Sequence, residues 1–321
     1  MKKALICGVS GQDGAYLSQY LLKKGYKVLG GSRDAQSNSF HNLESLGIKK
    51  EVEFISINLI DFRSTLQTIM KLKPDEIYNL SGQSSVGLSF EQPVETLESI
   101  VNGTLNILEA IRFSDIDIKF YNAGSSECFG DTSQEPADES SSFFPQSPYA
   151  IAKSTAYWLV HNYRESYKIN ACTGILFNHE SPLRPARYVT KKIVAAACNI
   201  RQGNQQKLKL GNIDIVRDWG WAPDYVEAMW LMLQREDLEE FVIATGESNS
   251  LLDFVNETFQ YLGLDYSEYL ETDNTLLRPS DLKIGSANPI KAKLKLGWTA
   301  NYKMKNVVEK MVDYELSGSK D

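Results

Sequence analysis

The chain has 321 residues, of which 42% are hydrophobic and 23% are charged, and its formal net charge is −7. This is ordinary globular composition, and the length allows one large or two modest hydrophobic cores. The acidic balance and the lack of a long basic run argue against a nucleic-acid partner, and no stretch approaches the 18 apolar residues of a membrane-spanning helix.

The first half of the chain alternates short apolar runs with longer amphipathic ones. The short runs predict buried strands over residues 3–7, 26–30, 52–56, 76–80, 118–122 and 171–177. The longer runs predict helices over residues 15–24, 62–72, 96–113 and 148–167. Because strands that alternate with helices are typical of a parallel sheet covered on both faces, we predict a Rossmann-type, doubly wound α/β fold.

After residue 178 this rhythm changes. A loop is expected over residues 179–187, which hold two prolines and two arginines. Helices are predicted over residues 188–201, 224–233, 251–262 and 303–314, and short strands over residues 208–211 and 241–244. We expect residues 1–178 to form a dinucleotide-binding domain and residues 179–321 to form mainly a smaller, interleaved substrate domain, with segments such as 208–235 returning to the first domain.

The four cysteines match no zinc-ligand spacing, and no C-x-x-C pair occurs. Cys7 and Cys172 lie in apolar runs and are expected to be buried thiols, and packing is also the expected role of Cys128. Reduced thiols fit the cytosol, and the N-terminal apolar run is too short for a signal peptide. We therefore expect a cytoplasmic protein without a metal site.

Three glycines, Gly8, Gly11 and Gly14, follow the first predicted strand and open the first helix. With Gln12 and Asp13 they form a G-x-x-G-x-x-G variant of the dinucleotide-binding pattern. Such a turn lets the backbone approach a pyrophosphate closely, and the helix N-terminus supplies N–H donors. A structural glycine turn is the alternative, but the position between strand and helix favours a nucleotide.

The end of the second predicted strand indicates which dinucleotide binds. An acidic residue there usually reads the ribose of NAD, whereas an arginine accommodates the 2′-phosphate of NADP. Arg33 comes first and favours NADP, while Asp34 keeps NAD open as the alternative. A solvated surface charge is the other interpretation of Arg33.

Ser125 and Glu127 follow the fifth predicted strand, at the sheet edge where ligands bind in such folds. Tyr149 and Lys153 are four residues apart, so they share one helix face. An ammonium beside the phenol is expected to lower the pKa of Tyr149 and to suit it as the base for a sugar hydroxyl. Ser125 would hydrogen-bond that hydroxyl, and Lys153 would also bind the nicotinamide ribose. A Tyr-x-x-x-Lys pair alone occurs by chance in many helices.

Glu127 suggests a second proton abstraction, which a simple alcohol dehydrogenase does not need. Oxidising a sugar at C4 acidifies the proton at C5, and a carboxylate can remove that proton so that water leaves from C6. The alternative role for Glu127 is a carboxylate at a helix start.

Six stretches carry a resemblance to a known family: G-Q-D-G at 11–14, E-I-Y-N-L at 76–80, S-P-Y at 147–149, G-I-L-F-N-H-E-S-P at 174–182, R-D-W-G at 217–220 and D-Y-V-E-A-M-W at 224–230. The last three are long and specific. On these stretches the chain resembles the GDP-mannose 4,6-dehydratase family of the extended short-chain dehydrogenase/reductase superfamily, over nearly its whole length.

The resemblance implies oxidation of GDP-mannose at C4, loss of water across C5 and C6, and return of the hydride to C6 from a tightly bound NADP. It implies catalytic roles for Ser125, Glu127, Tyr149 and Lys153. Besides the glycine turn and Arg33, it implies cofactor contacts at Asn58, Leu59, Leu80, Gln83, Ser84, Tyr149, Lys153, His179 and Arg184. It implies contacts to the GDP-sugar at Ser85, Ser126, Asn178, Lys192, Arg217 and Arg278. A homodimer is implied, with a homotetramer as the alternative.

Several positions depart from the family pattern. Gly124 stands where the family commonly has Ser, and Ser125 where it has Thr. Asn58 replaces an Asp expected to contact adenine. Trp221 is larger than the usual residue, and together with Gly124 it indicates a reshaped sugar pocket. A run of serines after the second strand replaces a stretch that contributes to tetramer contacts in relatives.

Three other functions remain as alternatives. A reductase or epimerase acting on a GDP-sugar would use the same scaffold, but a reductase has no C5 proton for Glu127 to remove. A dehydratase could act on a different GDP-sugar, such as a modified hexose or heptose. A non-catalytic nucleotide sensor is the third, and the retained Ser125, Tyr149 and Lys153 argue against it.

Overall fold

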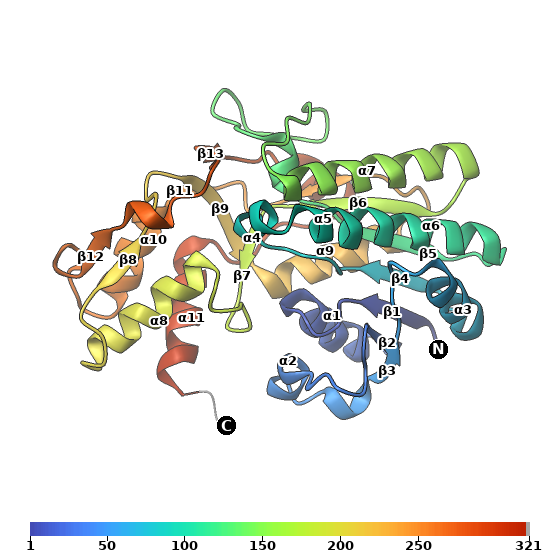
Figure 1. The fold of residues 1–321 in the computed structure, drawn as a ribbon, viewed down its shortest axis with the longest axis horizontal. Coiled ribbons are helices and arrows are strands. Elements are labelled where there is room, and N and C mark those ends of the chain that lie inside the picture. The colour runs from blue at the N-terminus through green and yellow to red at the C-terminus, as the bar shows by residue number, and fades with distance from the viewer. Residues whose placement is uncertain (319–321) are drawn as a thin grey trace.

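A seven-stranded, all-parallel sheet forms the larger of two lobes (Figure 1). The computed structural model describes residues 1–318. The strand order is β10-β6-β5-β4-β1-β2-β3. The strands are β1 Lys3–Cys7, β2 Lys27–Ser32, β3 Glu53–Ser56, β4 Glu76–Asn79, β5 Lys119–Ala123, β6 Ala171–Leu176 and β10 Phe241–Ile243. This is the predicted Rossmann-type architecture, which is confirmed.

Helices cover both faces of this sheet. They are α1 Gln12–Lys23, α2 His41–Ser45, α3 Phe62–Leu72, α4 Val86–Glu91, α5 Pro93–Leu97, α6 Gly103–Ser114, α7 Pro148–Tyr167 and α9 Ala222–Gln234. Side chains of β1 alternate between two cores, as the two-residue period of a strand requires. Ala4 and Ile6 enter the core that α1 and α9 cover, whereas Leu5 and Cys7 enter the core that α3, α6 and α7 cover.

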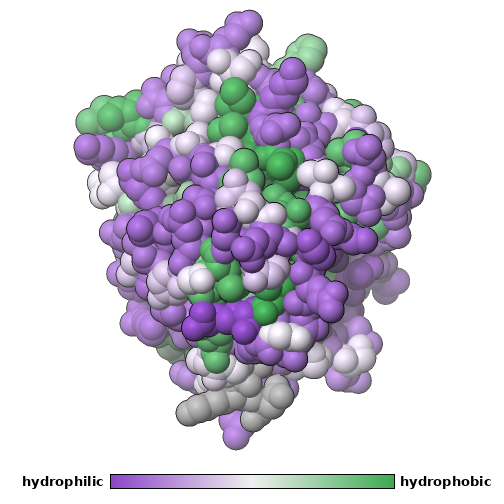
Figure 2. Space-filling view, turned by 90° about the vertical axis from the view of Figure 1, so that its left-hand side faces the viewer, coloured by the Kyte–Doolittle hydropathy of each residue, from purple (hydrophilic) through white to green (hydrophobic). Residues whose placement is uncertain are grey.

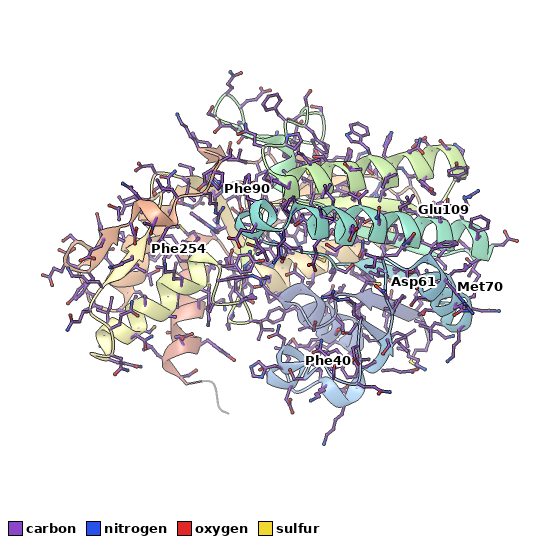
Figure 3. All side chains as sticks on the ribbon, in the orientation of Figure 1. Phe40, Asp61, Met70, Phe90, Glu109 and Phe254 are labelled. Atoms are coloured by element: carbon purple, nitrogen blue, oxygen red, sulfur yellow. The ribbon has the colours of Figure 1, made fainter. Side chains whose placement is uncertain are left out.

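Helices α3 and α7 have the bounds that the sequence predicts, and each begins at a residue whose side chain caps the helix. The Asp61 side chain accepts a hydrogen bond from the Ser64 N–H at the start of α3 (Figure 3). Ser147 caps α7 by accepting from the Ala150 N–H, and Pro148 occupies its first turn. The helix predicted over 96–113 starts earlier, at Pro93, and passes through a π-helical segment at Glu98–Asn102.

The smaller lobe has its own core, formed by α8 Val189–Arg201, α10 Leu251–Tyr261 and α11 Met304–Leu316. A strand pair, β8 Leu208–Leu210 and β12 Leu270–Thr272, packs on it. Phe254 and Trp219 are fully buried there, with ring centroids 5.4 Å apart (Figure 3). The outer side of this lobe is predominantly hydrophilic, with hydrophobic side chains in patches (Figure 2).

A four-stranded sheet joins the two lobes. Its strands are β7 Asn178–Glu180, β9 Val216–Trp221, β11 Ser248–Ser250 and β13 Ile284–Gly285, and the first, third and fourth all pair with β9. The expectation of a loop over 179–187 was therefore wrong at its start, because His179 and Glu180 lie in β7. β9 is not predicted from the sequence, because its R-D-W-G-W run is not continuously apolar.

The segment 208–235 is divided between the lobes. α9 packs against α1 and against β5 and β6 of the large sheet, whereas β8 stays in the smaller lobe. β10 then completes the edge of the large sheet beside β6. A domain boundary at residue 178 remains a proposal. Within residues 1–318, no helix is both long and apolar enough to cross a membrane.

Gly124, directly after β5, lies against β6 without space for a side chain. Its N–H donates to the Gly174 carbonyl at 2.8 Å. A Cβ atom added at this position would lie 2.8 Å from the Thr173 Cγ2 and 2.9 Å from the Gly174 oxygen. Glycine therefore stands in place of the family's usual serine at a position where close packing against β6 leaves no room for a side chain.

We predict that Gly124→Ser lowers the free energy of unfolding by about 1 to 3 kcal/mol, since overpacking displaces a neighbouring strand. Urea denaturation of the parent and the variant measures this change. Thr173→Ser removes the crowding methyl group and should reduce the penalty when it is combined with Gly124→Ser. A Gly124→Ser variant as stable as the parent would contradict the packing explanation.

Candidate functional site

Side chains from both lobes line a cavity of about 210 Å³ at the carboxyl ends of β4, β5 and β6. Ligands of open parallel sheets bind at this edge. The sequence-predicted residues that line it are Asp13, Leu80, Ser84, Ser85, Ser125, Ser126, Glu127, Tyr149, Lys153, Asn178, His179, Arg184, Arg217 and Arg278. The structure thus brings all four predicted catalytic residues into one cavity.

The other predicted residues lie outside the lining of this cavity. They are Gly8, Gly11, Gln12, Gly14, Arg33, Asn58, Leu59, Gln83 and Lys192. Arg33 and Asn58 follow β2 and β3, so they lie further along the same edge of the sheet. Lys192 donates to the Lys209 carbonyl at 2.7 Å, in an exposed position of the smaller lobe.

The glycine turn between β1 and α1 is shaped by close backbone packing. Gly8 has a φ of +86°, and a Cβ atom there would lie 2.7 Å from the Leu80 oxygen. A Cβ atom at Gly14 would lie 2.4 Å from the Gly8 oxygen. Gly11 is the N-cap of α1 and makes no side-chain hydrogen bond, so the cap residue leaves the first-turn N–H groups without a side-chain acceptor. These N–H groups fit a pyrophosphate.

Gln12 and Asp13 join this turn to the start of the smaller lobe. The Gln12 side chain donates to the His179 carbonyl at 3.2 Å and accepts from the Ser181 hydroxyl at 2.7 Å. His179 Nε2 lies 2.9 Å from the Asp13 carboxylate, and His179 Nδ1 lies 2.7 Å from the Phe177 carbonyl. Both ring nitrogens thus face acceptors, which favours the protonated imidazole.

The pKa values of this pair agree with that charge state. Burial opposes the charge of His179, but the Asp13 carboxylate outweighs it and raises the pKa of His179. Burial likewise opposes the charge of Asp13, but His179 and the Gln12 hydrogen bond lower the pKa of Asp13 overall. The two side chains therefore form a partly buried ion pair between segments 166 residues apart.

The Ser125, Tyr149 and Lys153 side chains lie together but differ from one expectation. Burial raises the pKa of Tyr149, and a hydrogen bond with Ser125 only partly lowers it. The Lys153 ammonium donates to the Ala123 carbonyl at 2.7 Å and lies 5.8 Å from the Tyr149 ring centroid. Burial lowers the pKa of Lys153 to about 8. The expectation that Lys153 depresses the pKa of Tyr149 was therefore wrong, because burial dominates and Ser125 is the partner.

Glu127 lies in a short helical turn, Ser126–Phe129, that Ser125 caps by accepting from the Glu127 N–H at 3.3 Å. Burial raises the pKa of Glu127, and the guanidinium groups of Arg217 and Arg278 oppose this rise. A carboxyl whose pKa is raised holds a proton more readily than an ordinary glutamate does. This arrangement suits an acid/base group.

The two arginines meet at Asp281, which the sequence analysis did not identify. An Arg217 nitrogen lies 3.4 Å from the Asp281 carboxylate, and an Arg278 nitrogen lies 3.7 Å from it. The position of Asp281 three residues after Arg278 is the sequence feature that could have indicated this ion pair. Tyr188 and Trp219 also line the cavity, and only Trp219 lies in a motif that the sequence analysis identified.

The expectation that Trp221 and Gly124 reshape the sugar pocket is not supported. The Trp221 ring packs 6.3 Å from Tyr302 and lies under Lys310, outside the cavity lining. Gly124 is part of the lining, but its missing side chain would point at Thr173.

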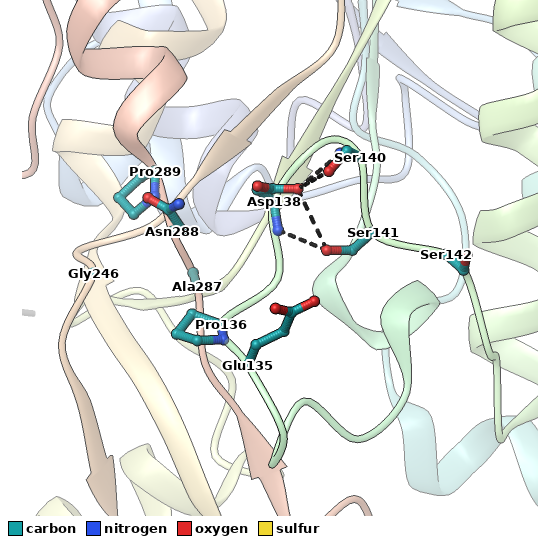
Figure 4. A pocket seen from close by; sticks show the side chains of 10 residues that line it. All are labelled: Glu135, Pro136, Asp138, Ser140, Ser141, Ser142, Gly246, Ala287, Asn288 and Pro289. Carbon is teal, nitrogen blue, oxygen red and sulfur yellow. Dashed lines mark hydrogen bonds between the residues drawn. The ribbon is translucent and has the colours of Figure 1, made fainter.

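A second hollow, of about 680 Å³, contains none of the predicted residues (Figure 4). It lies between the loop after β5 and the segment around Ala287. Its Asp138 carboxylate accepts hydrogen bonds from Ser140 and Ser141, so the loop itself satisfies this group. These contacts are those of a surface turn.

Comparison with known proteins identifies relatives along almost the whole chain. The family model described as "GDP-mannose 4,6 dehydratase" matches residues 5–311. GDP-mannose 4,6 dehydratase 1 of Arabidopsis thaliana is 43% identical over 99% of this chain and 91% of its own, and GDP-mannose 4,6-dehydratase of Vibrio cholerae is 41% identical over 98% and 94%.

The solved structure of dTDP-glucose 4,6-dehydratase from Bacillus anthracis in complex with NAD superposes with a TM-score of 0.86, at 19% identity, over 99% of this chain and 97% of its own. This likeness shows the shared fold. The match to the family model and the two relatives cover almost the entire chain. The chain therefore belongs to the GDP-mannose 4,6-dehydratase family.

Proposed function

We propose that this protein is a hydro-lyase that converts GDP-mannose to GDP-4-keto-6-deoxy-mannose and water. The observation that carries the proposal is the half-buried Glu127 beside Ser125, Tyr149 and Lys153 in one cavity. A carboxyl acid/base next to a Ser-Tyr-Lys group is what an elimination coupled to oxidation and reduction requires. Family membership supports the same reaction.

The residues at the sheet edge fit a nicotinamide dinucleotide. The glycine turn and the uncapped start of α1 would hold the pyrophosphate, and Lys153 and Tyr149 lie where the nicotinamide ribose would be bound. The bound dinucleotide would supply the oxidation of the sugar at C4 and the reduction at C6. The partly buried His179–Asp13 pair would support the wall of the cavity next to this turn.

NADP is our proposal for the dinucleotide. Arg33 is exposed directly after β2, where a 2′-phosphate would lie. The Asp34 carboxylate accepts hydrogen bonds from the N–H groups of Gln36 at 2.9 Å and Ser37 at 3.1 Å. Because these bonds hold the Asp34 carboxylate in a turn, Arg33 is the side chain that would contact the 2′-phosphate of the ribose.

The cavity residues account for the movement of protons. The phenolate form of Tyr149, which burial disfavours, would take the proton of the sugar hydroxyl at C4, and Tyr149 would give a proton to C5 when C6 is reduced, so that Tyr149 also returns to its starting state. Glu127 would remove the C5 proton and deliver it to the departing C6 hydroxyl, which leaves as water. The C5–H bond and the C6–O bond break, a C5–C6 double bond forms, and Glu127 returns to its starting state.

The GDP-sugar is proposed to bind through its diphosphate at Arg217 and Arg278. A pair of guanidinium groups suits phosphate oxygens through bidentate hydrogen bonds. Lys192 is proposed as a further contact, although its ammonium donates to the Lys209 carbonyl in this structure. GDP-mannose remains our first substrate, and a modified GDP-hexose or heptose is the alternative.

The first experiment is an incubation of the purified protein with GDP-mannose and no added cofactor. We expect a 4-keto-6-deoxy sugar without net change in absorbance at 340 nm, because the cofactor returns to its starting state in each turnover. Denaturing the protein should release NADP, which mass spectrometry would identify. A strict requirement for added NADPH would instead identify a reductase, and a lack of turnover of any GDP-hexose would identify a nucleotide sensor.

Glu127→Gln should lower the rate of water loss by a factor on the order of 10² or more, since an amide cannot accept the C5 proton. Oxidation at C4 should continue, so absorbance at 340 nm should rise once GDP-mannose is added. Glu135→Gln, an exposed change on the following loop, is the matched control and should behave like the parent. Water loss at the parent rate in Glu127→Gln would assign the C5 base to another residue.

A homodimer and a cytoplasmic location are also proposed. All four cysteines are buried free thiols, which fits a reducing compartment. The neighbouring helices α5 and α7 leave large apolar side chains exposed: Val94 by 67%, Leu97 by 38%, Ile151 by 48% and Trp158 by 56%. Adjacent exposed apolar residues of this kind mark interfaces between proteins.

Trp158→Glu should convert the dimer to a monomer, because it places a charge in the centre of the proposed interface. Light scattering coupled to size-exclusion chromatography measures the mass. Leu316→Glu, an exposed apolar position on α11, is the control and should leave the mass unchanged. A parent protein that is already a monomer, or a dimer that survives Trp158→Glu, would contradict this interface.

A further inference from the structure

Two hydroxyl groups from different lobes meet at the rim of the cavity. The Tyr188 Oη lies 2.8 Å from the Ser84 Oγ, within hydrogen-bonding distance. Ser84 is in the loop between β4 and α4 of the larger lobe, and Tyr188 immediately precedes α8 of the smaller lobe. Both residues line the cavity. The bond therefore connects the two walls between which a sugar would lie.

The Tyr188 ring is held in place from one side. The Arg184 guanidinium carbon lies 3.9 Å from the ring centroid, and an Arg184 nitrogen lies 3.1 Å from the Glu180 carboxylate. That carboxylate also accepts from the Thr190 hydroxyl at 2.7 Å. A stacked guanidinium fixes the plane of the ring and leaves the hydroxyl free to bond across the rim.

The Ser84–Tyr188 bond is unsuited to holding the fold together. It is exposed to solvent, so water replaces either partner at little cost. The lobes are already joined by the buried bonds from Gln12 and Asp13 to residues 179–181. A solvent-exposed bond between two lobes can open and close without disturbing that connection.

We propose that Tyr188 is a positioning residue that, through Ser84, fastens the two lobes over the bound sugar during the reaction. This inference rests on the proposed function. The proposed elimination leaves an unsaturated keto sugar that must stay in the cavity until C6 receives hydrogen. If that sugar escapes early, the cofactor remains reduced and the enzyme is inactive. Retention of the sugar is therefore the property that the bond serves.

The position of Tyr188 next to the reacting groups supports this role. Its phenol is close enough to Tyr149 to contribute to the raised pKa of that residue, after burial. Ser85, beside Ser84, also lines the cavity. The Tyr188 hydroxyl therefore lies within electrostatic reach of the proposed catalytic hydroxyl of Tyr149.

Tyr188→Phe tests the proposal, because it deletes one hydroxyl group and keeps the ring that stacks on Arg184. In the Glu127→Gln background, which can oxidise the sugar but cannot remove water, the bound sugar nucleotide (GDP-mannose and its 4-keto form) should dissociate about threefold to tenfold faster with this change, as expected for one lost hydrogen bond. The fluorescence of Trp219 in the cavity wall reports this rate by stopped flow. GDP, which lacks the sugar, should dissociate at an unchanged rate.

With Glu127 intact, Tyr188→Phe should uncouple the oxidation at C4 from the reduction at C6. Absorbance at 340 nm should then build up during turnover, whereas the parent should show no such increase. Ser84→Ala should reproduce both effects, and the double variant should be no worse than either single one, since both remove the same bond. Tyr302→Phe, a partly exposed tyrosine away from the cavity, is the control and should match the parent.

Unchanged dissociation of GDP-mannose in Tyr188→Phe would overturn the proposal, as would effects of Tyr188→Phe and Ser84→Ala that add in full. Equal acceleration of GDP and GDP-mannose would also overturn it, because the bond would then act on the nucleotide. A parent protein that binds GDP-mannose but forms no keto sugar would refute only the proposed function, while the dissociation rates would still test Tyr188.

Discussion

The buried bonds between the glycine turn and residues 179–181 are the constraint on which the site depends. Gln12 and Asp13 stand at the start of α1, and their partners His179 and Ser181 begin the smaller lobe. Removing one partner of a buried pair leaves the other unsatisfied, at a cost of about 1 to 3 kcal/mol. The same residues therefore belong to the glycine turn and hold the second cavity wall against the first.

The electrostatics of the cavity follow from a balance between burial and arginine charge. Burial raises the pKa of Glu127, and Arg217 and Arg278 act against it. Burial also lowers the pKa of Arg217, while Glu127 and Asp281 act in the opposite direction. The proposed acid/base carboxyl and the proposed diphosphate contacts are therefore one coupled set of charges.

Much of the fold and the grouping of site residues could be predicted from the sequence. The strands of the large sheet are recognisable as apolar runs because helices bury them on both faces. The residues after β5 and those at the start of α7 could be expected to meet, because both lie at the carboxyl edge of the sheet. β9 could not be predicted, because Asp218 within it accepts three backbone hydrogen bonds from residues 245–247 and breaks the apolar pattern. The bond of Lys153 to Ala123 and the meeting of Tyr188 with Ser84 depend on side-chain and loop conformations that no local pattern encodes.

The place of β10 in the chain has a consequence for synthesis on the ribosome. The large sheet gains its last strand from residues 241–243, after the chain has built β7, α8, β8, β9 and α9. At 5 to 20 residues per second, translation reaches this strand after roughly 12 to 50 s. Until then the edge of β6 has no neighbour on that side, and an unpaired strand edge is a template for aggregation. A truncation before residue 241 would therefore leave the edge of β6 unpaired in the larger lobe and would also remove part of the smaller lobe.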